Sequence, residues 1–285
     1  MGSCLPWSET VLCSQHRGGY PMVRIGAVAY APYVVTIFEG IKRHFHRQGL
    51  ELDWVLYSNY DALVTAFVAG EVDLAWNGPL AHVKVRRALT TPCKVVAMRD
   101  IDSGYTTEFI TQKDAPIQKL TDLRDRRVAL GRQGSVQAGL LPYHFLKEAG
   151  LRPDADLSCT FHEERPPTDQ SDEASVVALV ASGEYDAGAV SGVTIRTLRA
   201  NGRFPEDRVR VFWSSPGYSH CCFTAQPGMD EALARRLTAA FTAMRYDDPE
   251  HRAVLDLEHC TAFIPGTPEG FDTLEKAALA EGLIA

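Results

Sequence analysis

A short pattern that occurs twice constrains the fold of this chain more than any other feature of its sequence. Residues 69–75 read Ala-Gly-Glu-Val-Asp-Leu-Ala, and residues 182–188 read Ser-Gly-Glu-Tyr-Asp-Ala-Gly, 113 residues further on. In each copy an apolar helical segment is stopped by glycine and is followed by a strand-like segment. The recurrence predicts two similar lobes. The length of 285 residues agrees, because single cores seldom grow beyond about 250–300 residues.

Strand-like and helix-like segments alternate around the first copy. Residues 23–29 form a short apolar run, and residues 34–45 carry apolar side chains at helical spacing. Residues 50–56 alternate as a strand, residues 60–68 have one apolar helical face, and residues 73–76 are strand-like before a turn. The alternation continues to the end of the chain. It is typical of the α/β class with largely parallel sheets.

The charge and hydropathy of the chain exclude several classes of partner. A net charge of −7 disfavours nucleic acids and anionic membranes, and the basic clusters at residues 84–87 and 124–127 are short enough to be solvated faces. The longest clean apolar run, residues 176–181, is far shorter than a membrane span. We therefore expect a small-molecule ligand, no nucleic-acid partner and no membrane insertion.

The N-terminal segment and the cysteines bear on the compartment. Residues 1–21 lack the basic start, apolar core and small-residue cleavage site of a signal peptide, so we expect a disordered extension over residues 1–22 and a cytoplasmic location. A periplasmic or extracellular location would require a different N-terminus. The seven cysteines show no CxxC or Cys/His ligand spacing, which indicates reduced thiols, no metal site and no disulfide framework.

A glycine- and serine-containing loop is the best candidate for an anion site. Residues 131–139 follow a strand-like segment and precede a helix, so Ser135, Gln137 and the backbone N–H groups beside them face a positive helix end. A plain strand-to-helix turn is the alternative, because every helix start offers such groups. The spacing matches neither a P-loop nor a dinucleotide fingerprint, so no cofactor is predicted.

Two acids begin a later helix. Asp172 and Glu173 end a polar stretch without aliphatic residues, at the N-terminus of an apolar helical segment. They are either favourable first-turn acids or carboxylates that face a cleft and meet a cationic group.

Three sequence segments together resemble one family. They are the string Gly-Glu-Val-Asp-Leu-Ala-Trp-Asn-Gly-Pro-Leu at 70–80, Ser-Gly-Tyr at 103–105 followed by Lys-Asp-Ala-Pro-Ile at 113–117 and Leu-Thr-Asp-Leu at 120–123, and the Ser135 loop ending in Pro-Tyr at 142–143. These segments resemble the phosphonate-binding branch of type II periplasmic substrate-binding proteins, and the resemblance extends from about residue 23 to residue 274.

The resemblance implies two α/β lobes joined by two crossing strands, with a ligand held in the cleft between them. The first lobe would comprise residues 23–102 and 219–285, and the second residues 103–218. Ligands of such sheets sit beyond the carboxyl ends of strands. If the chain is exported, the resemblance also implies the permease of an ABC transporter as a partner.

Carried over position by position, the resemblance implies a set of ligand-binding residues: Tyr30, Tyr33, Asn77, Tyr105, Ser135, Gln137, Asp172, Glu173 and Ser191. The chain departs from the family where Val136 replaces a hydroxyl residue of the anion loop and where Asn77 replaces an aromatic hydroxyl. Asp172 and Glu173 also stand in place of a His-Glu pair. Two carboxylates would repel a phosphonate dianion, so we expect a ligand with one anionic group at Ser135 and Gln137 and an amine or other donor facing Asp172 or Glu173.

A cytosolic enzyme on the same fold is the second hypothesis. Lyases, decarboxylases or dehydratases acting on small carboxylates in a biosynthetic pathway need a titratable group, and His220 would lie on the hinge side of the cleft. Cys221 or Cys222 would be a nucleophile only as a thiolate. Strand alternation points the two thiols to opposite faces, so at least one is expected in the core.

Overall fold

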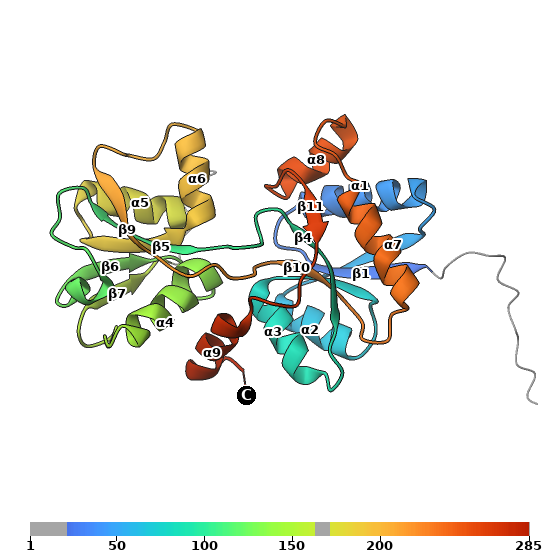
Figure 1. Ribbon diagram of the computed structural model, residues 1–285, viewed down its shortest axis with the longest axis horizontal. Helices are drawn as coiled ribbons and strands as arrows, with labels where there is room; N and C mark the ends of the chain where they lie inside the picture. The colour runs from blue at the N-terminus through green and yellow to red at the C-terminus, as the bar shows by residue number, and fades with distance from the viewer. Residues whose placement is uncertain (1–21, 163–171, 285) are drawn as a thin grey trace, which may run out of the picture.

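The computed structural model describes residues 22–162 and 172–284, and these build two mixed sheets (Figure 1). The six-stranded sheet has the order β11-β4-β10-β3-β1-β2 and the five-stranded sheet the order β7-β6-β8-β5-β9. We call each sheet with its helices a lobe, the six-stranded one first. The expected extension over residues 1–22 lies outside the described residues except for Met22.

The strands of the first lobe are β1 (Val23–Val28), β2 (Leu52–Tyr57), β3 (Leu74–Asn77), β4 (Lys94–Arg99), β10 (Cys222–Ala225) and β11 (Phe263–Pro265). Its helices are α1 (Val34–Arg47), α2 (Tyr60–Val68), α3 (Pro79–Ala88), α7 (Glu231–Thr242) and α8 (Pro249–Leu257). The predicted helices at residues 34–45 and 60–68 are confirmed as α1 and α2. Apolar residues of α1, α7 and α8 cover one face of the sheet, and those of α2 and α3 cover the other.

The strands of the second lobe are β5 (Thr107–Gln112), β6 (Arg127–Leu130), β7 (Ser158–Phe161), β8 (Ala187–Ser191) and β9 (Val209–Ser214). Its helices are α4 (Leu141–Glu148), α5 (Asp172–Ser182) and α6 (Gly192–Ala200), with a 3-10 turn η1 (Leu120–Leu123) and a π-helical turn η2 (Val136–Leu140). The apolar faces of α5 and α6 pack on one side of this sheet and those of η1 and α4 on the other.

The expectation of largely parallel sheets is wrong. Strands β1, β2 and β3 pair in parallel, as do β6, β7 and β8, but β5, β10 and β11 pair antiparallel with their neighbours. The parallel strands are joined through helices within one lobe, whereas β5 and β10 are the strands that enter a lobe from the other one. The crossing of the chain between lobes therefore reverses strand direction.

The repeated pattern has the same structure in both lobes. Gly70 and Gly183 have φ of +76° and +80°, a left-handed conformation that ends α2 and α5. Asp73 then accepts a hydrogen bond from the backbone N–H of Arg24, which lies in β1, and Asp186 accepts one from Arg127 in β6, both at 2.8 Å. Each aspartate thus fastens the strand that follows it to its parallel neighbour.

Two chain crossings join the lobes, at residues 100–106 and 215–221, and they pair with each other. Tyr105 and Tyr218 exchange two backbone hydrogen bonds of 2.8 and 2.9 Å, and the His220 N–H donates to the Asp102 carbonyl at 2.9 Å. The two crossings therefore form a short antiparallel ladder between the lobes.

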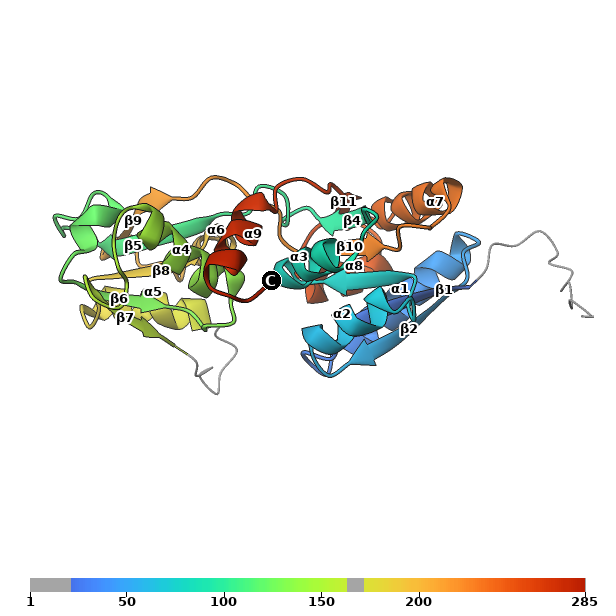
Figure 2. The same ribbon diagram turned by 90° about the horizontal axis from the view of Figure 1, so that it is seen from below.

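The helix α9 (Asp272–Ala280) forms a third connection between the lobes, and both views place it between them (Figures 1 and 2). Its Glu275 pairs with Arg86 and Arg87 of α3 in the first lobe. Glu281, one residue beyond the helix, pairs with Lys147 of α4 in the second lobe at 2.7 Å. Phe271 and Leu274, both fully buried, belong to a cluster that draws on both lobes. Among the described residues, no helix is both long and apolar enough to cross a bilayer.

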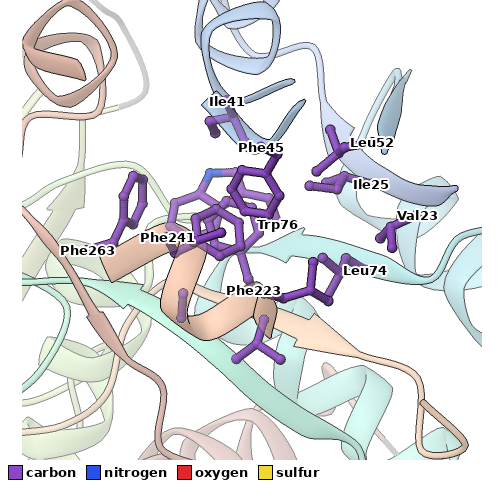
Figure 3. Close-up of a cluster of buried hydrophobic side chains, with 14 of the residues drawn as sticks. Val23, Ile25, Ile41, Phe45, Leu52, Leu74, Trp76, Phe223, Phe241 and Phe263 are labelled. Carbon is purple, nitrogen blue, oxygen red and sulfur yellow. The ribbon is translucent and has the colours of Figure 1, made fainter. Parts of the chain in front are cut away.

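The core of the first lobe is centred on Phe223 of β10 (Figure 3). Its ring stacks on Trp76 at 4.4 Å and on Phe241 at 4.2 Å between centroids, and its side chain is 1% exposed. Phe223 thereby fixes β10 against β3, the strand that leads to the cavity described below.

We expect Phe223→Ala to lower the free energy of unfolding by about 3–5 kcal/mol, because it removes a buried ring and leaves a cavity. Urea unfolding followed by circular dichroism measures this loss. Val35→Ala is the control, since Val35 is 45% exposed and its truncation is expected to change stability by about 0.5 kcal/mol or less. Equal stability of Phe223→Ala and the native protein would contradict the packing described.

Candidate functional site

A cavity of about 230 Å³ lies between the two lobes. It is found beyond the carboxyl ends of β3 and β6, where each strand gives way to a helical segment, α3 and η2 respectively. The lining residues are Tyr60, Gly78, Pro79, Leu80, Ala81, Lys84, Arg132, Gly134, Ser135, Val136, Gln137, Asp172, His220 and Cys221. Both lobes and the second crossing therefore contribute residues to the lining of this cavity, which we call its wall.

The first lobe presents the N-terminus of α3 to the cavity. Gly78 is the residue before the helix and Pro79 is its first residue, and no side chain caps the first turn. Proline has no N–H, and the N–H groups of Leu80 and Ala81 have no acceptor inside the helix. Because both residues line the cavity, these N–H groups and the positive helix end are available to an anion.

The second lobe presents the N-terminus of η2. The Ser135 hydroxyl oxygen accepts from the Ala138 N–H at 3.3 Å, which leaves its own O–H as a donor. The N–H groups of Val136 and Gln137, in the first turn of η2, border the cavity. A Cβ at Gly139 would lie 2.3 Å from the Arg132 carbonyl oxygen, so the loop closes this tightly only with glycine there.

Two cations and one carboxylate line the cavity. Lys84 projects from α3 and donates to Asp61 at 2.6 Å, and Arg132 lies in the loop after β6. The Arg132 Nε atom lies 3.6 Å from the Asp172 carboxylate, and the Arg132 backbone N–H donates to the same oxygen at 3.1 Å. Each cation thus has a carboxylate partner beside the cavity, and both reach the wall, where an anionic ligand would contact them.

The second acid of the α5 N-terminus lies behind the wall. Glu173 is 5% exposed and accepts hydrogen bonds from three groups: Gln137 Nε2 at 2.9 Å, the Ser191 N–H at 2.6 Å and the Thr194 hydroxyl at 2.8 Å. Its carboxylate therefore ties η2 to the N-terminus of α6.

A buried polar network runs from the first lobe through the hinge to Gln137. The Asp102 carboxylate is fully buried and accepts from Arg99 at 2.7 and 2.8 Å and from the Cys221 N–H at 3.2 Å. Its Oδ1 also lies 3.2 Å from His220 Nδ1, and the other ring nitrogen, Nε2, lies 3.2 Å from Gln137 Oε1. The His220 imidazole thereby links the hinge to the anion loop.

The pKa values of the two carboxyl groups beside Arg99 are shifted in opposite directions. Burial alone would raise the pKa of Asp102, but Arg99 and His220 outweigh it and lower that pKa to about 2. Burial raises the pKa of Glu258, on the other side of Arg99, to about 7, because the guanidinium at 3.4 Å only partly compensates for the lost hydration. One arginine thus holds Asp102 as a carboxylate at neutral pH and leaves Glu258 poised to titrate.

The family model described as "ABC transporter, phosphonate, periplasmic substrate-binding protein" matches residues 37–271. The chain belongs to this family. The resemblance stated from the sequence and the two-lobe fold are confirmed, and the chain is a cleft-type binding protein for an anionic small molecule.

Two curated relatives are named for the anions that they bind or import. The probable ABC transporter phosphite binding protein PhnD1 of Prochlorococcus marinus is 26% identical over 80% of this chain and 77% of the relative. The phosphate-import protein PhnD of Mycolicibacterium smegmatis is 26% identical over 70% of this chain and 64% of the relative.

A solved structure supports the fold. The structure of PhnD1 from Prochlorococcus marinus in complex with methylphosphonate superimposes with a TM-score of 0.65 at 24% identity, over 92% of this chain and 99% of the other. The family description names periplasmic proteins, which supports a periplasmic or extracellular location for this substrate-binding protein. The cytoplasmic location expected from the N-terminal residues finds no support.

Four of the predicted site residues of this substrate-binding protein line the cavity: Ser135, Gln137, Asp172 and His220. Three more lie directly behind it. Glu173 holds Gln137, and Ser191 caps α6 through its hydroxyl. Tyr105 stacks on the His220 ring with 4.2 Å between centroids and hydrogen-bonds to Ser191.

The remaining predicted residues lie elsewhere. Asn77 is fully buried, and its Nδ2 donates to the Thr224 hydroxyl at 3.0 Å, so this side chain holds β3 to β10. Tyr30 and Tyr33 are 41% and 37% exposed in the loop after β1, where their rings meet edge to face. The Tyr30 hydroxyl hydrogen-bonds to the Glu258 carboxyl, and Tyr30 is not among the residues that line the cavity.

The thiols are poorly placed for the nucleophilic chemistry of the enzyme hypothesis. Cys222 is buried in the core, as strand alternation predicted for one of the pair, and Cys221 faces the cavity. Burial raises the pKa of both thiols well above the ordinary value, so they are protonated at neutral pH. Cys221 Sγ and Asp102 Oδ1 also contact the same nitrogen of His220, whereas a base that activates a thiol uses one nitrogen for each partner.

Sequence reasoning missed several residues of the site, above all Lys84, Arg132 and the Arg99–Asp102 pair. Lys84 belongs to a basic cluster that we expected to be solvated, yet it lines the cavity. Its neighbours Arg86 and Arg87 pair with α9. The available signal was Gly78-Pro79 after a strand, which marks a helix start of the same kind as the Ser135 loop.

We expect Glu258→Gln to change how stability depends on pH. Because the folded-state pKa of about 7 exceeds the ordinary value of 4.5, the native protein binds the proton more tightly and loses stability as pH rises from 4.5 through 7. The glutamine variant lacks this loss, so its stability relative to the native protein rises over this window by on the order of 3 kcal/mol. Urea unfolding at pH 5 and pH 8.5 measures the change, and a constant difference between the two proteins would contradict the assignment.

Proposed function

We propose that this protein is the extracytoplasmic receptor of an ABC importer for a small tetrahedral phosphorus oxyanion, such as phosphite, phosphate or a short alkylphosphonate. The observation that carries the proposal is that two helical N-termini, from α3 and η2 on opposite lobes, border the same cavity. An oxyanion there receives N–H groups from both lobes at once, so its binding energy draws the lobes together.

The side chains around these N-termini match that ligand class. Lys84 and Arg132 supply positive charge, and the Ser135 O–H is a directional donor. The cavity of about 230 Å³ suits a small ligand. The relatives named for phosphite and phosphate support the same class.

The arrangement favours a simple oxyanion over the zwitterion expected from the sequence. Asp172 is paired with Arg132, and Glu173 is saturated by donors from within the chain. An amine on the ligand would have to displace one of these partners. The proposal also assigns a membrane partner, the permease of the importer, which would recognise the closed form.

Isothermal titration calorimetry with phosphite, phosphate, methylphosphonate and an aminoalkylphosphonate tests this proposal. We expect at least one of the first three to bind, and the amino group to add no affinity over methylphosphonate. Binding of none of the four would refute the proposed ligand class, and tighter binding of the aminoalkylphosphonate would restore the amine contact at Asp172.

We expect Lys84→Met to weaken binding of the oxyanion that the native protein prefers by roughly 10- to 100-fold, because a charge-assisted donor contributes about 1.5–3 kcal/mol. Lys42→Met is the matched control. Lys42 also pairs with an aspartate, Asp53 at 3.0 Å, but lies on α1 away from the cavity, so its loss is expected to leave affinity unchanged. The same affinity for both variants would show that the cavity at Lys84 does not hold the anion.

A further inference from the structure

The imidazole of His220 contacts polar groups of both crossings and of the anion loop. Its Nδ1 lies 3.2 Å from Asp102 Oδ1, its Nε2 lies 3.2 Å from Gln137 Oε1, and its side chain borders the cavity. The protonation of this ring therefore affects both the contact between the lobes and the charge of the ligand site.

The orientation of the Gln137 amide determines whether the His220 Nε2 atom has to carry a proton. Its Nε2H2 group donates to the Glu173 carboxylate at 2.9 Å, and an ionised carboxylate only accepts. The amide oxygen is therefore the atom turned toward His220. A carbonyl oxygen also only accepts, so the contact between lobes is a hydrogen bond only when His220 Nε2 carries a proton.

The Asp102 carboxylate likewise requires a proton on the Nδ1 atom of His220. Asp102 is held as an anion by Arg99, so its Oδ1 attracts an N–H and repels a nitrogen lone pair. The ring satisfies Asp102 and Gln137 together only as the doubly protonated imidazolium. The neutral ring has one proton for two acceptors, and the Cys221 thiol, 3.2 Å from Nδ1, then serves as a donor to the bare nitrogen.

Charged groups on several elements surround His220, and some favour the doubly protonated ring whereas others oppose it. Asp102 of the first crossing attracts a cationic ring, Arg99 at the end of β4 repels it, and Glu258 lies on the other side of Arg99. Lys84 of α3, Arg132 and Asp172 lie on the cavity side of the ring. Tyr105 stacks on the ring, and Glu173 contacts it indirectly through Gln137. Tyr60 at the start of α2 also borders the cavity. An anion bound among Lys84 and Arg132 offsets their repulsion of an imidazolium.

We propose that this cleft captures its oxyanion together with one proton, which His220 takes up so that its ring donates to Asp102 of the hinge and to Gln137 of the anion loop at the same time. The inference rests on the proposed function, because it needs an anion in this cavity. By linkage, a proton taken up on binding makes the affinity fall as pH rises, by at most about tenfold per pH unit.

Calorimetry in pairs of buffers with different ionisation enthalpies measures the protons taken up when methylphosphonate binds near pH 7. The ligand's own ionisation contributes equally to every variant, so the difference between variants isolates His220. We expect the native protein to take up as much as one proton more per ligand than His220→Gln, and its affinity to fall more steeply between pH 6 and pH 8. His46→Gln is the control, because His46 is exposed, lies on α1 and pairs with Glu51.

A second variant keeps the test decisive if His220→Gln does not fold. Gln137→Leu leaves His220 in place but removes the acceptor at Nε2, so the neutral ring with a proton on Nδ1 satisfies Asp102, and we expect reduced proton uptake. Unchanged uptake in the folded variants would overturn the coupling while leaving anion binding intact. Failure of methylphosphonate, phosphite and phosphate to bind the native protein at any pH would instead overturn the proposed function, and the coupling with it.

Discussion

The ion pair between Arg99 and Asp102 is the interaction on which the rest of the site depends. Asp102 follows β4 at the first crossing between the lobes, and its fully buried carboxylate would be costly without a partner. Arg99 supplies two hydrogen bonds to it and lies over the Trp76 ring at 5.4 Å, so the pair is anchored in the core of the first lobe. With its position fixed, Asp102 orients both His220 and the Cys221 backbone of the second crossing.

The consequence is a continuous polar path across the hinge. It runs from Asp102 through His220 and Gln137 to Glu173, which holds the N-terminus of α6. Each member is buried or nearly so, and buried polar groups are costly unless they are satisfied. His220 is the one member of this path that contacts the hinge, the anion loop and the cavity.

Two further features concern the contact between the lobes and the donors of the cavity. Glu275 of helix α9 pairs with α3 of the first lobe, and Glu281, one residue beyond α9, pairs with Lys147 of α4 in the second, so the C-terminal segment contacts both lobes. The cavity combines side-chain donors such as Lys84, Arg132 and Ser135 with backbone N–H groups at two helix starts. Both kinds of donor suit an anionic small molecule.

Much of the site could be anticipated where its signals are local. The Ser135 loop was predictable because glycine and serine between a strand and a helix leave N–H groups unpaired in any fold. The twin aspartates of the repeat indicated duplicated lobes, and both fasten a strand to its neighbour. By contrast, nothing adjacent in sequence marks Asn77 as a core residue, because its partner Thr224 comes from a strand 147 residues away.

The sequence by itself determined the alternation of strands and helices, the glycine-terminated repeat and the two helix starts, because each follows from backbone preferences and apolar periodicity over a few residues. Only the tertiary structure decided the charge of the cavity and the environment of His220. Lys84 and Arg132 reach one cavity from different lobes, and Asp102 meets His220 across a separation of 118 residues. The energies of buried charges depend on such distant partners and on the exclusion of water, which no local pattern encodes.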